Sequence, residues 1–153
     1  MLIKVRDSKI HGRGIFAIKD IPKKTKIVEY KGKKITKKQA DKIYEKSVES
    51  AEKNNNSITT YLFELNKKYD LDGNIKDNIA KYINHSCNPN CEVVNEDDHI
   101  WIYSIKDIKK DEEISFDYGF PLEDYKDHVC KCGSKNCIGY IVKKKYRKWI
   151  KKE

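Results

Sequence analysis

The chain has 153 residues, of which 38% are hydrophobic and 37% charged, and its formal net charge is +9 at pH 7. Ten Tyr, four Phe and two Trp supply enough large side chains for one core, so global disorder is excluded and we expect one domain, with at most a small appendage. No apolar run approaches the ~18 residues of a membrane span, no signal peptide is expected, and five cysteines, an odd number, do not fit a disulfide-bonded miniprotein.

The first 35 residues predict short strands separated by turns. Apolar and β-branched residues group at Ile3–Val5, Gly14–Ile18 and Lys26–Tyr30. Between the first two groups, the segment His11-Gly12-Arg13-Gly14 predicts a turn in which the backbone bends tightly or approaches another group closely.

Residues 36–53 predict an amphipathic helix. Thr36 and Gln39 have the spacing of a capping box. Residues suited to one buried stripe then recur with the helical period, and these are Ala40, Ile43, Tyr44, Ser47, Val48 and Ala51. Three asparagines at 54–56 follow and predict the loop that ends the helix.

After residue 57 the pattern returns to β. Strands are predicted at Ile58–Leu65, Tyr69–Asp72, Glu92–Asn95, His99–Ile105 and Glu113–Asp117, with a single helical turn at Asn78–Ile83. The third and fourth of these strands form a hairpin. Helices and strands do not alternate regularly, which excludes a doubly wound parallel sheet and favours a mainly β fold with short helices, of the α+β class.

A cysteine-rich stretch follows. Residues 130–137 read C-x-C-x4-C, and three thiolates so close together suit a tetrahedral metal such as zinc. The alternative is three free buried thiols. Spacing alone leaves the fourth ligand open among Cys87, Cys91, His85, His99 and His128.

The positive charge is concentrated at the C-terminus, where residues 143–153 hold seven Lys and Arg and one Glu. Val142, Tyr146, Trp149 and Ile150 have helical spacing, so a helix over 143–152 is predicted to bury these four side chains. The basic side chains Lys143–Lys145, Arg147 and Lys148 would then be exposed. Such a tail can bind nucleic acid or an acidic partner, or it can be a solvated helix face.

The segment from Tyr82 to Asn90, Tyr-Ile-Asn-His-Ser-Cys-Asn-Pro-Asn, is dense in polar groups that need hydrogen-bond partners if it enters a core. Alone, it could be a complex turn. Other segments accompany it in a fixed order, namely His11-Gly12-Arg13-Gly14, Glu29-Tyr30-Lys31-Gly32, Tyr61-Leu62-Phe63, Asp72, Glu112-Glu113-Ile114-Ser115-Phe116-Asp117-Tyr118-Gly119 and the cysteine motif. Together they resemble the SET-domain protein lysine methyltransferases with a cysteine-rich post-SET segment, from about His11 to about Tyr140.

Two departures from the family pattern stand before this segment. The family usually has Gly-Asn and then Arg-Phe, where this chain has Asp77-Asn78 and Lys81-Tyr82. Lys and Tyr keep the charge and the aromatic ring, but Asp77 lacks the conformational freedom of glycine, so the geometry of that loop is an open question.

The resemblance implies a fold of several small sheets with a threaded, knot-like segment around the Asn-His-Ser-Cys region. It implies a SET domain over residues 1–122, with a helical insert at about 36–56. A post-SET zinc knuckle and a basic helix would occupy residues 123–153.

The resemblance also implies an activity, in which methyl groups pass from S-adenosylmethionine to lysine ε-amines of a protein, most commonly a histone tail. Tyr118 and Tyr61 match the catalytic tyrosines, and Phe116 the position that controls the number of methyl groups, with di- or trimethyllysine expected. Cofactor contacts carry over to Arg13, Gly14, Tyr30, Asn84 and His85. The zinc ligands would be Cys87, Cys130, Cys132 and Cys137.

A catalytically silent SET-like module that binds chromatin or nucleic acid is the competing interpretation. Such a module would be expected to lose Tyr61, Asn84 or Tyr118, and all three are present, which favours an enzyme. We expect an intracellular protein, in the nucleus or on chromatin if it acts on histones, whose basic tail contacts DNA or nucleosomes. Cys91 is expected to be a small buried residue, and His11, His99 and His128 to be surface or structural.

Overall fold

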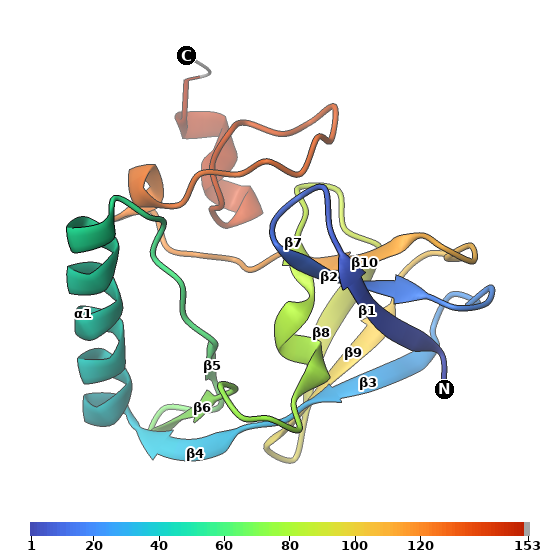
Figure 1. Cartoon of the computed structure of the whole chain (residues 1–153), viewed down its shortest axis with the longest axis horizontal. Coiled ribbons are helices and arrows are strands. Elements are labelled where there is room, and N and C mark those ends of the chain that lie inside the picture. The colour runs from blue at the N-terminus through green and yellow to red at the C-terminus, as the bar shows by residue number, and fades with distance from the viewer. Residues whose placement is uncertain (152–153) are drawn as a thin grey trace. The chain divides into compact units, whose positions relative to one another are not determined.

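The structure, a computed structural model, describes residues 1–151 (Figure 1). The chain forms two compact units: unit 1 comprises Met1–Ile27, Tyr82–Val93 and the chain from Ile102 on, and unit 2 comprises Val28–Lys81 and Val94–Trp101. Several small sheets and a few helices confirm the predicted mainly β class. The knot-like threading stays a prediction. Among the described residues, no helix is long and apolar enough to cross a membrane.

The main sheet of unit 1 has the strand order β1-β2-β10-β7 (Figure 1). Its strands are β1 (Ile3–Asp7), β2 (Arg13–Ala17), β10 (Glu113–Phe116) and β7 (Asn84–His85). β10 runs antiparallel to β2 but parallel to β7, so that Ser115 lies opposite Asn84 and Phe116 opposite His85. Two segments far apart in the sequence, both singled out by the motif pattern, are therefore hydrogen-bonded neighbours.

A second sheet has the order β3-β9-β8, with β3 at Lys26–Tyr30, β9 at His99–Ser104 and β8 at Cys91–Glu96. β8 and β9 are the predicted hairpin. Its turn residues Asp97 and Asp98 have φ of 50° and 66°, both in the left-handed region that suits a two-residue hairpin turn and that Asp tolerates better than most residues.

Unit 2 contains the third sheet, in the order β4-β6-β5, and the long helix α1. α1 (Lys37–Asn54) begins directly after β4 (Lys33–Thr36) and packs on β4 and on β6 (Tyr69–Asp72) (Figure 1). The predicted capping box of Thr36 and Gln39 is present, and every residue of the predicted stripe is buried or half-buried. β5 is only Leu62–Glu64, so the predicted strand over Ile58–Leu65 was too long, and β4 was not predicted.

The departure at Asp77 has no structural cost. A glycine would be required there if the backbone adopted a positive φ, but Asp77 is not among the described residues with positive φ. The short 3-10 helix η1 (Ile79–Tyr82) follows, close to the predicted helical turn. The loop therefore accepts the aspartate without backbone strain.

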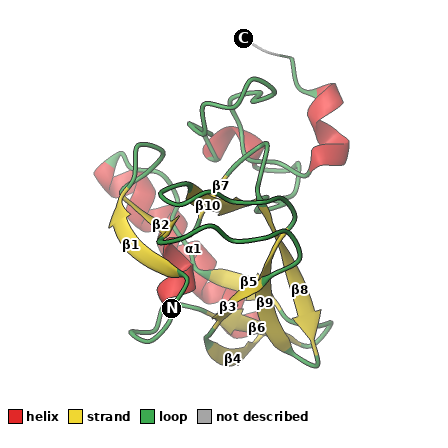
Figure 2. Ribbon diagram, turned by 90° about the vertical axis from the view of Figure 1, so that its right-hand side faces the viewer, coloured by secondary structure: helices red, strands yellow, loops and turns green. Residues whose placement is uncertain are grey.

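The C-terminal segment consists mostly of loop, with two short 3-10 helices, η2 (Tyr125–Asp127) and η3 (Lys144–Trp149) (Figure 2). The prediction of a docked helix over 143–152 was wrong in three respects. The helix is a shorter 3-10 helix, Trp149 is 61% exposed, and the Arg147 side chain is only 10% exposed. Contacts of Arg147 with distant parts of unit 1 hold this segment, whereas Val142 and Ile150 are buried as predicted. Lys152 lies outside the described residues.

Candidate functional site

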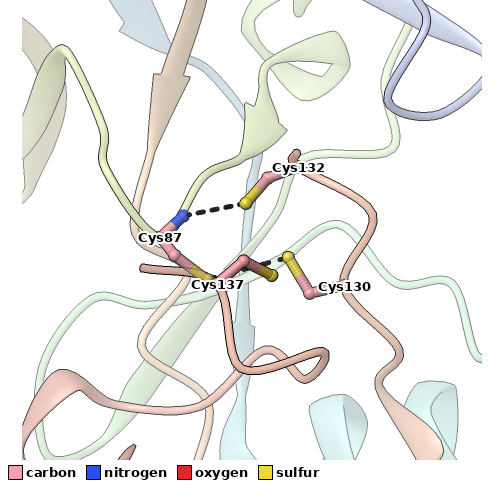
Figure 3. Close-up of side chains that lie close together, drawn as sticks. All are labelled: Cys87, Cys130, Cys132 and Cys137. Carbon is pink, nitrogen blue, oxygen red and sulfur yellow. Dashed lines mark hydrogen bonds between the residues drawn. The ribbon is translucent and has the colours of Figure 1, made fainter. Parts of the chain in front are cut away.

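Four cysteine side chains converge in unit 1 (Figure 3). Cys87 follows β7, and Cys130, Cys132 and Cys137 come from the C-terminal loop. Their Sγ atoms all lie within 4.8 Å of one another, and the Sγ atoms of Cys87 and Cys130 are 3.8 Å apart. Tetrahedral zinc with Zn–S bonds of about 2.3 Å separates its sulfurs by about 3.8 Å, so the spacing fits zinc. The structure thus places Cys87 beside the three cysteines of the C-x-C-x4-C motif, and the binding of zinc by these four residues stays a prediction.

Donors surround these sulfurs. The backbone N–H of Cys87 donates to Sγ of Cys132 over 3.5 Å, and that of Gly139 to Sγ of Cys137 over 3.4 Å. The pKa of Cys87 is lowered to about 3, first because its Sγ accepts a hydrogen bond from Cys130 and then through the nearby His85 imidazole. The pKa of the Cys130 thiol, which donates this hydrogen bond, is raised by the same contact, so one proton is shared between the two sulfurs. A metal that binds both sulfurs as thiolates would displace that proton.

Cys91, His99 and His128, three of the other candidates for the fourth ligand, do not join the cluster. Cys91 is 1% exposed, as expected, and burial raises the pKa of its thiol to about 12. The buried His128 contacts Asp124 through its Nε2, 3.2 Å from the carboxylate, and His99 contacts Glu29 at 2.7 Å. These histidines are structural or surface residues, as the sequence analysis expected.

The buried Asn84 amide connects β7 to the turn before β2. Its Nδ2 donates to the carbonyl oxygens of His11, at 3.3 Å, and Arg13, at 3.0 Å, and to Oε1 of Glu113, at 2.8 Å. A Cβ at Gly14 would lie 2.3 Å from Oε1 of Glu113, so a larger residue there would push this carboxylate out of its contact with Asn84. Arg13, Gly14 and Asn84, which were predicted to contact the cofactor, lie together in the structure.

The Glu113 carboxylate was not predicted to belong to the site. It accepts from Asn84 and, at 2.7 Å and 2.9 Å, from the hydroxyl of Ser8. It therefore ties the turn, β10 and β7 into one hydrogen-bonded unit. The only signal for it was its place in the run Glu112-Glu113-Ile114, where one of two acidic neighbours must face the sheet interior.

Tyr118 is fixed at both its backbone and its side chain. Its hydroxyl donates to the carbonyl of Ile83 over 2.7 Å, and its backbone N–H donates to Nδ1 of His85 over 3.1 Å. Its ring lies in an aromatic cluster, with ring centres 5.1 Å from Phe116 and 5.5 Å from Phe120. Phe120 was not predicted to belong to the site.

The His85 side chain links Tyr118 to the cysteine cluster. Because Nδ1 accepts from the Tyr118 amide, the ring proton of the neutral imidazole belongs on Nε2. Nε2 lies 3.5 Å from Sγ of Cys87 and can donate to it. From the sequence, His85 was predicted to contact the cofactor and was left among the candidates for the fourth metal ligand, but a link between Tyr118 and Cys87 was not predicted.

Tyr30 and Tyr61 both lie in unit 2 and contact each other. Tyr30 is 4% exposed, its hydroxyl donates to the backbone carbonyl of Tyr61 over 2.9 Å, and its ring stands 5.0 Å from that of Phe63. Gly73 packs so closely on the Tyr30 ring that a Cβ there would collide with it. Tyr30 therefore positions the backbone of Tyr61.

The comparisons with known proteins agree with this arrangement. The family model described as SET domain matches residues 12–119. Histone-lysine N-methyltransferase set-2 of Caenorhabditis elegans is 39% identical over 144 residues, which are 92% of this chain and 9% of that protein. Histone-lysine N-methyltransferase trr of Drosophila melanogaster is 38% identical over 148 residues, 94% of this chain and 6% of that protein.

Human histone-lysine N-methyltransferase 2D is 38% identical over 151 residues, which are 94% of this chain. The chain spans 2% of the length of that protein. In all three relatives it thus corresponds to a small part of a much longer protein.

Proposed function

The chain belongs to the SET-domain family, and we propose that it is a protein-lysine N-methyltransferase that acts on a histone tail and uses S-adenosylmethionine. The observation that carries the proposal is the joining of the Asn84 amide, the His85 ring, Tyr118 and four convergent cysteines in one unit. The names of the relatives supply the substrate class. The protein would act in the nucleus, on chromatin.

The residues at the Asn84 turn fit the amino-acid end of S-adenosylmethionine. Two backbone carbonyls converge on the Asn84 amide within 3.3 Å, a setting that also suits an ammonium group, and Arg13 is an exposed cation for a carboxylate. When bound, this cofactor supplies an electrophilic methyl group on a positively charged sulfur. Arg13, Gly14, Tyr30, Asn84 and His85 are the residues that we propose hold it.

A lysine amine must be neutral to attack. With a pKa of about 10.4 in water, neutrality at pH 7 costs about 4.6 kcal/mol. Aromatic rings exclude water and so lower this cost by disfavouring the ammonium. Tyr118 and Tyr61 are proposed to orient the amine through their hydroxyls, which act without the negative charge that would stabilise the ammonium. The amine nitrogen would bond to the methyl carbon as the bond between that carbon and the cofactor's sulfur breaks, which leaves a neutral thioether. The proton lost from the methylated nitrogen would go to water.

Phe116 is proposed to set the product. It is 4% exposed, lies beside Tyr118 and carries no hydroxyl to fix a water molecule. A methylated amine therefore keeps room to rotate and present its lone pair again. We infer di- or trimethyllysine as the final product.

Zinc would be held by Cys87, Cys130, Cys132 and Cys137, as a structural ion with four sulfur ligands and no open position. We place the boundary between a SET domain, 1–122, and a post-SET segment, 123–153, just after the end of the family match at residue 119. The ion would stabilise that segment.

The basic tail is proposed to contact DNA or nucleosomes. Lys143, Lys144, Lys145 and Lys148 are exposed, and so is Trp149. Replacing these four lysines with glutamine should weaken binding to nucleosomes in low salt. If binding is unchanged, these four lysines form only a solvated surface and do not contact nucleosomes.

The activity is tested by incubating the zinc-loaded chain with labelled S-adenosylmethionine and a panel of histones and lysate proteins. Mass spectrometry then identifies the acceptor. We expect a histone lysine to carry the label. Labelling of a different protein would revise the substrate, and the absence of lysine labelling in every fraction would favour the silent binding module.

A further inference from the structure

Arg147 lies in η3, beyond the residues that the SET-domain model matches. Its side chain is only 10% exposed, whereas Lys145 and Lys148 on the same short helix are exposed. A guanidinium does not lose its charge in proteins, so its burial requires partners for its donors.

The partners of Arg147 come from three segments of unit 1. Nη2 donates to Oδ2 of Asp117 over 2.7 Å, Nη1 to the carbonyl of Cys87 over 3.0 Å and Nε to the carbonyl of Val142 over 3.3 Å. The first partner precedes Tyr118 directly in the chain, and the second is a proposed zinc ligand. The Arg147 side chain thus contacts both the loop that contains Cys87 and the residue before Tyr118.

Neighbouring contacts extend this connection. The Cys87 carbonyl also accepts from Nδ2 of Asn136, in the cysteine loop, over 3.0 Å. The second oxygen of Asp117 accepts from the backbone of Gly119 over 2.9 Å and stands 3.6 Å from Nδ1 of His85, the atom that accepts from the Tyr118 amide. The Asp117 carboxylate therefore braces the turn that contains Tyr118.

We propose that Arg147 is a positioning residue that couples the cysteine cluster to Tyr118, an inference that rests on the function proposed above. It orients the Asp117 carboxylate on one side and the Cys87 carbonyl on the other. Without it, the loop that presents Cys87 and the turn that presents Tyr118 lose their common anchor. The C-terminal segment would then help to position residues of the site.

The test compares Arg147→Gln with Lys148→Gln in the zinc-loaded full chain. The control removes the same charge from an exposed neighbour in the same helix. Three quantities are measured: the rate of zinc release to a chromophoric chelator, the hydrogen-exchange rate of the Tyr118 amide, and kcat and KM on a histone peptide. Replacing a residue that supports metal ligands typically lowers metal affinity or activity about ten- to hundredfold.

For Arg147→Gln we expect zinc release and Tyr118 amide exchange to be faster by at least about tenfold, and kcat to fall more than KM changes. Arg147→Lys keeps the charge but not the forked geometry, so its rates should lie between those of the unchanged chain and those of Arg147→Gln. If Arg147→Gln does not fold, Asp117→Asn removes the main partner and should accelerate amide exchange at Tyr118.

Two results would overturn the proposal. One is equal zinc release and equal amide exchange in Arg147→Gln and Lys148→Gln. The other is faster zinc release with an unchanged Tyr118 amide, which would make Arg147 a support of the cysteine loop alone. Both readouts work in an inactive protein, so a failure of the proposed methyltransferase activity is recognised separately, as absent turnover by the unchanged chain.

Discussion

Helix α1 and the C-terminal segment 129–151 are of similar length but are stabilised in different ways. α1 satisfies its own backbone groups, starts at a capping box and buries a stripe that includes Ala40 and Ala51. Residues 129–151 have only the short 3-10 helix η3 and one β-bridge, between Val129 and Tyr140. Their contacts within unit 1 come from the converging cysteines, from Arg147, and from the buried side chains of Val142 and Ile150. Local sequence therefore determines the first region, and distant partners determine the second.

Loss of a proposed zinc ligand should have the largest effect, and it should act on residues 129–151 but not on α1. Cys132→Ser removes one of the four proposed zinc ligands, and structural zinc contributes on the order of 10 kcal/mol to small metal-dependent folds. Hydrogen exchange should show protection lost over residues 129–151 and retained over α1. Metal analysis of the unchanged chain should find one zinc. Retained protection of both regions in the variant would contradict a metal-dependent segment.

Alkaline pH tests a cysteine outside both regions. The Cys91 thiol has a pKa of about 12 in the folded chain against 9.0 as its ordinary value, because it is buried. Between pH 9 and pH 12 the Cys91 thiol is ionised in the unfolded chain but still protonated in the folded chain. Its contribution to the free energy of unfolding is therefore fully present below pH 9 and is lost as the pH rises toward 12. The slope from this group is about 1.4 kcal/mol per pH unit.

Denaturant unfolding at pH 8 and pH 10.5 measures that slope with zinc in excess. Cys91→Ala should be less steep than the unchanged chain. The alanine variant controls for the lysines and tyrosines that titrate in the same range. Equal slopes would show that the thiol ionises in the folded state.

A smaller effect is expected at the start of α1. Thr36→Ala removes the cap, which should lower the free energy of unfolding by about 1 kcal/mol. Because the cap serves only local helix structure, zinc release should not change. A denaturant titration with a parallel chelator assay checks both, and faster zinc release would show that the two regions are coupled.

The smallest expected effect is a change of product. Phe116→Tyr adds a hydroxyl that can fix a water molecule, a bias of about 0.5–1.5 kcal/mol for one hydrogen bond. The product should shift toward monomethyllysine with zinc content unchanged, as measured by mass spectrometry over extended turnover. If the unchanged chain stops at monomethyllysine with cofactor in excess, the role of Phe116 is wrong.

The two regions also differ in what the sequence could predict. α1 and its cap were predicted almost to the residue, because the signals lie within one helix. The tail was misassigned, because spacing treats Arg147 as a surface residue, and only the fold supplies Asp117 and the Cys87 carbonyl. β4 was missed since two of its four residues are lysines. The cysteine cluster was predicted through resemblance, whereas spacing left the fourth ligand open.

The most direct test of the central claim is methyl transfer by Tyr118→Phe, compared with Tyr69→Phe as a matched loss of a hydroxyl in unit 2. Both zinc-loaded variants and the unchanged chain are given a histone peptide and S-adenosylmethionine, and the methylated product is measured by mass spectrometry. We expect Tyr118→Phe to lose at least about 10²-fold in rate at equal zinc content, because the amine is no longer oriented, while Tyr69→Phe keeps the rate of the unchanged chain. Equal rates for all three proteins would contradict it.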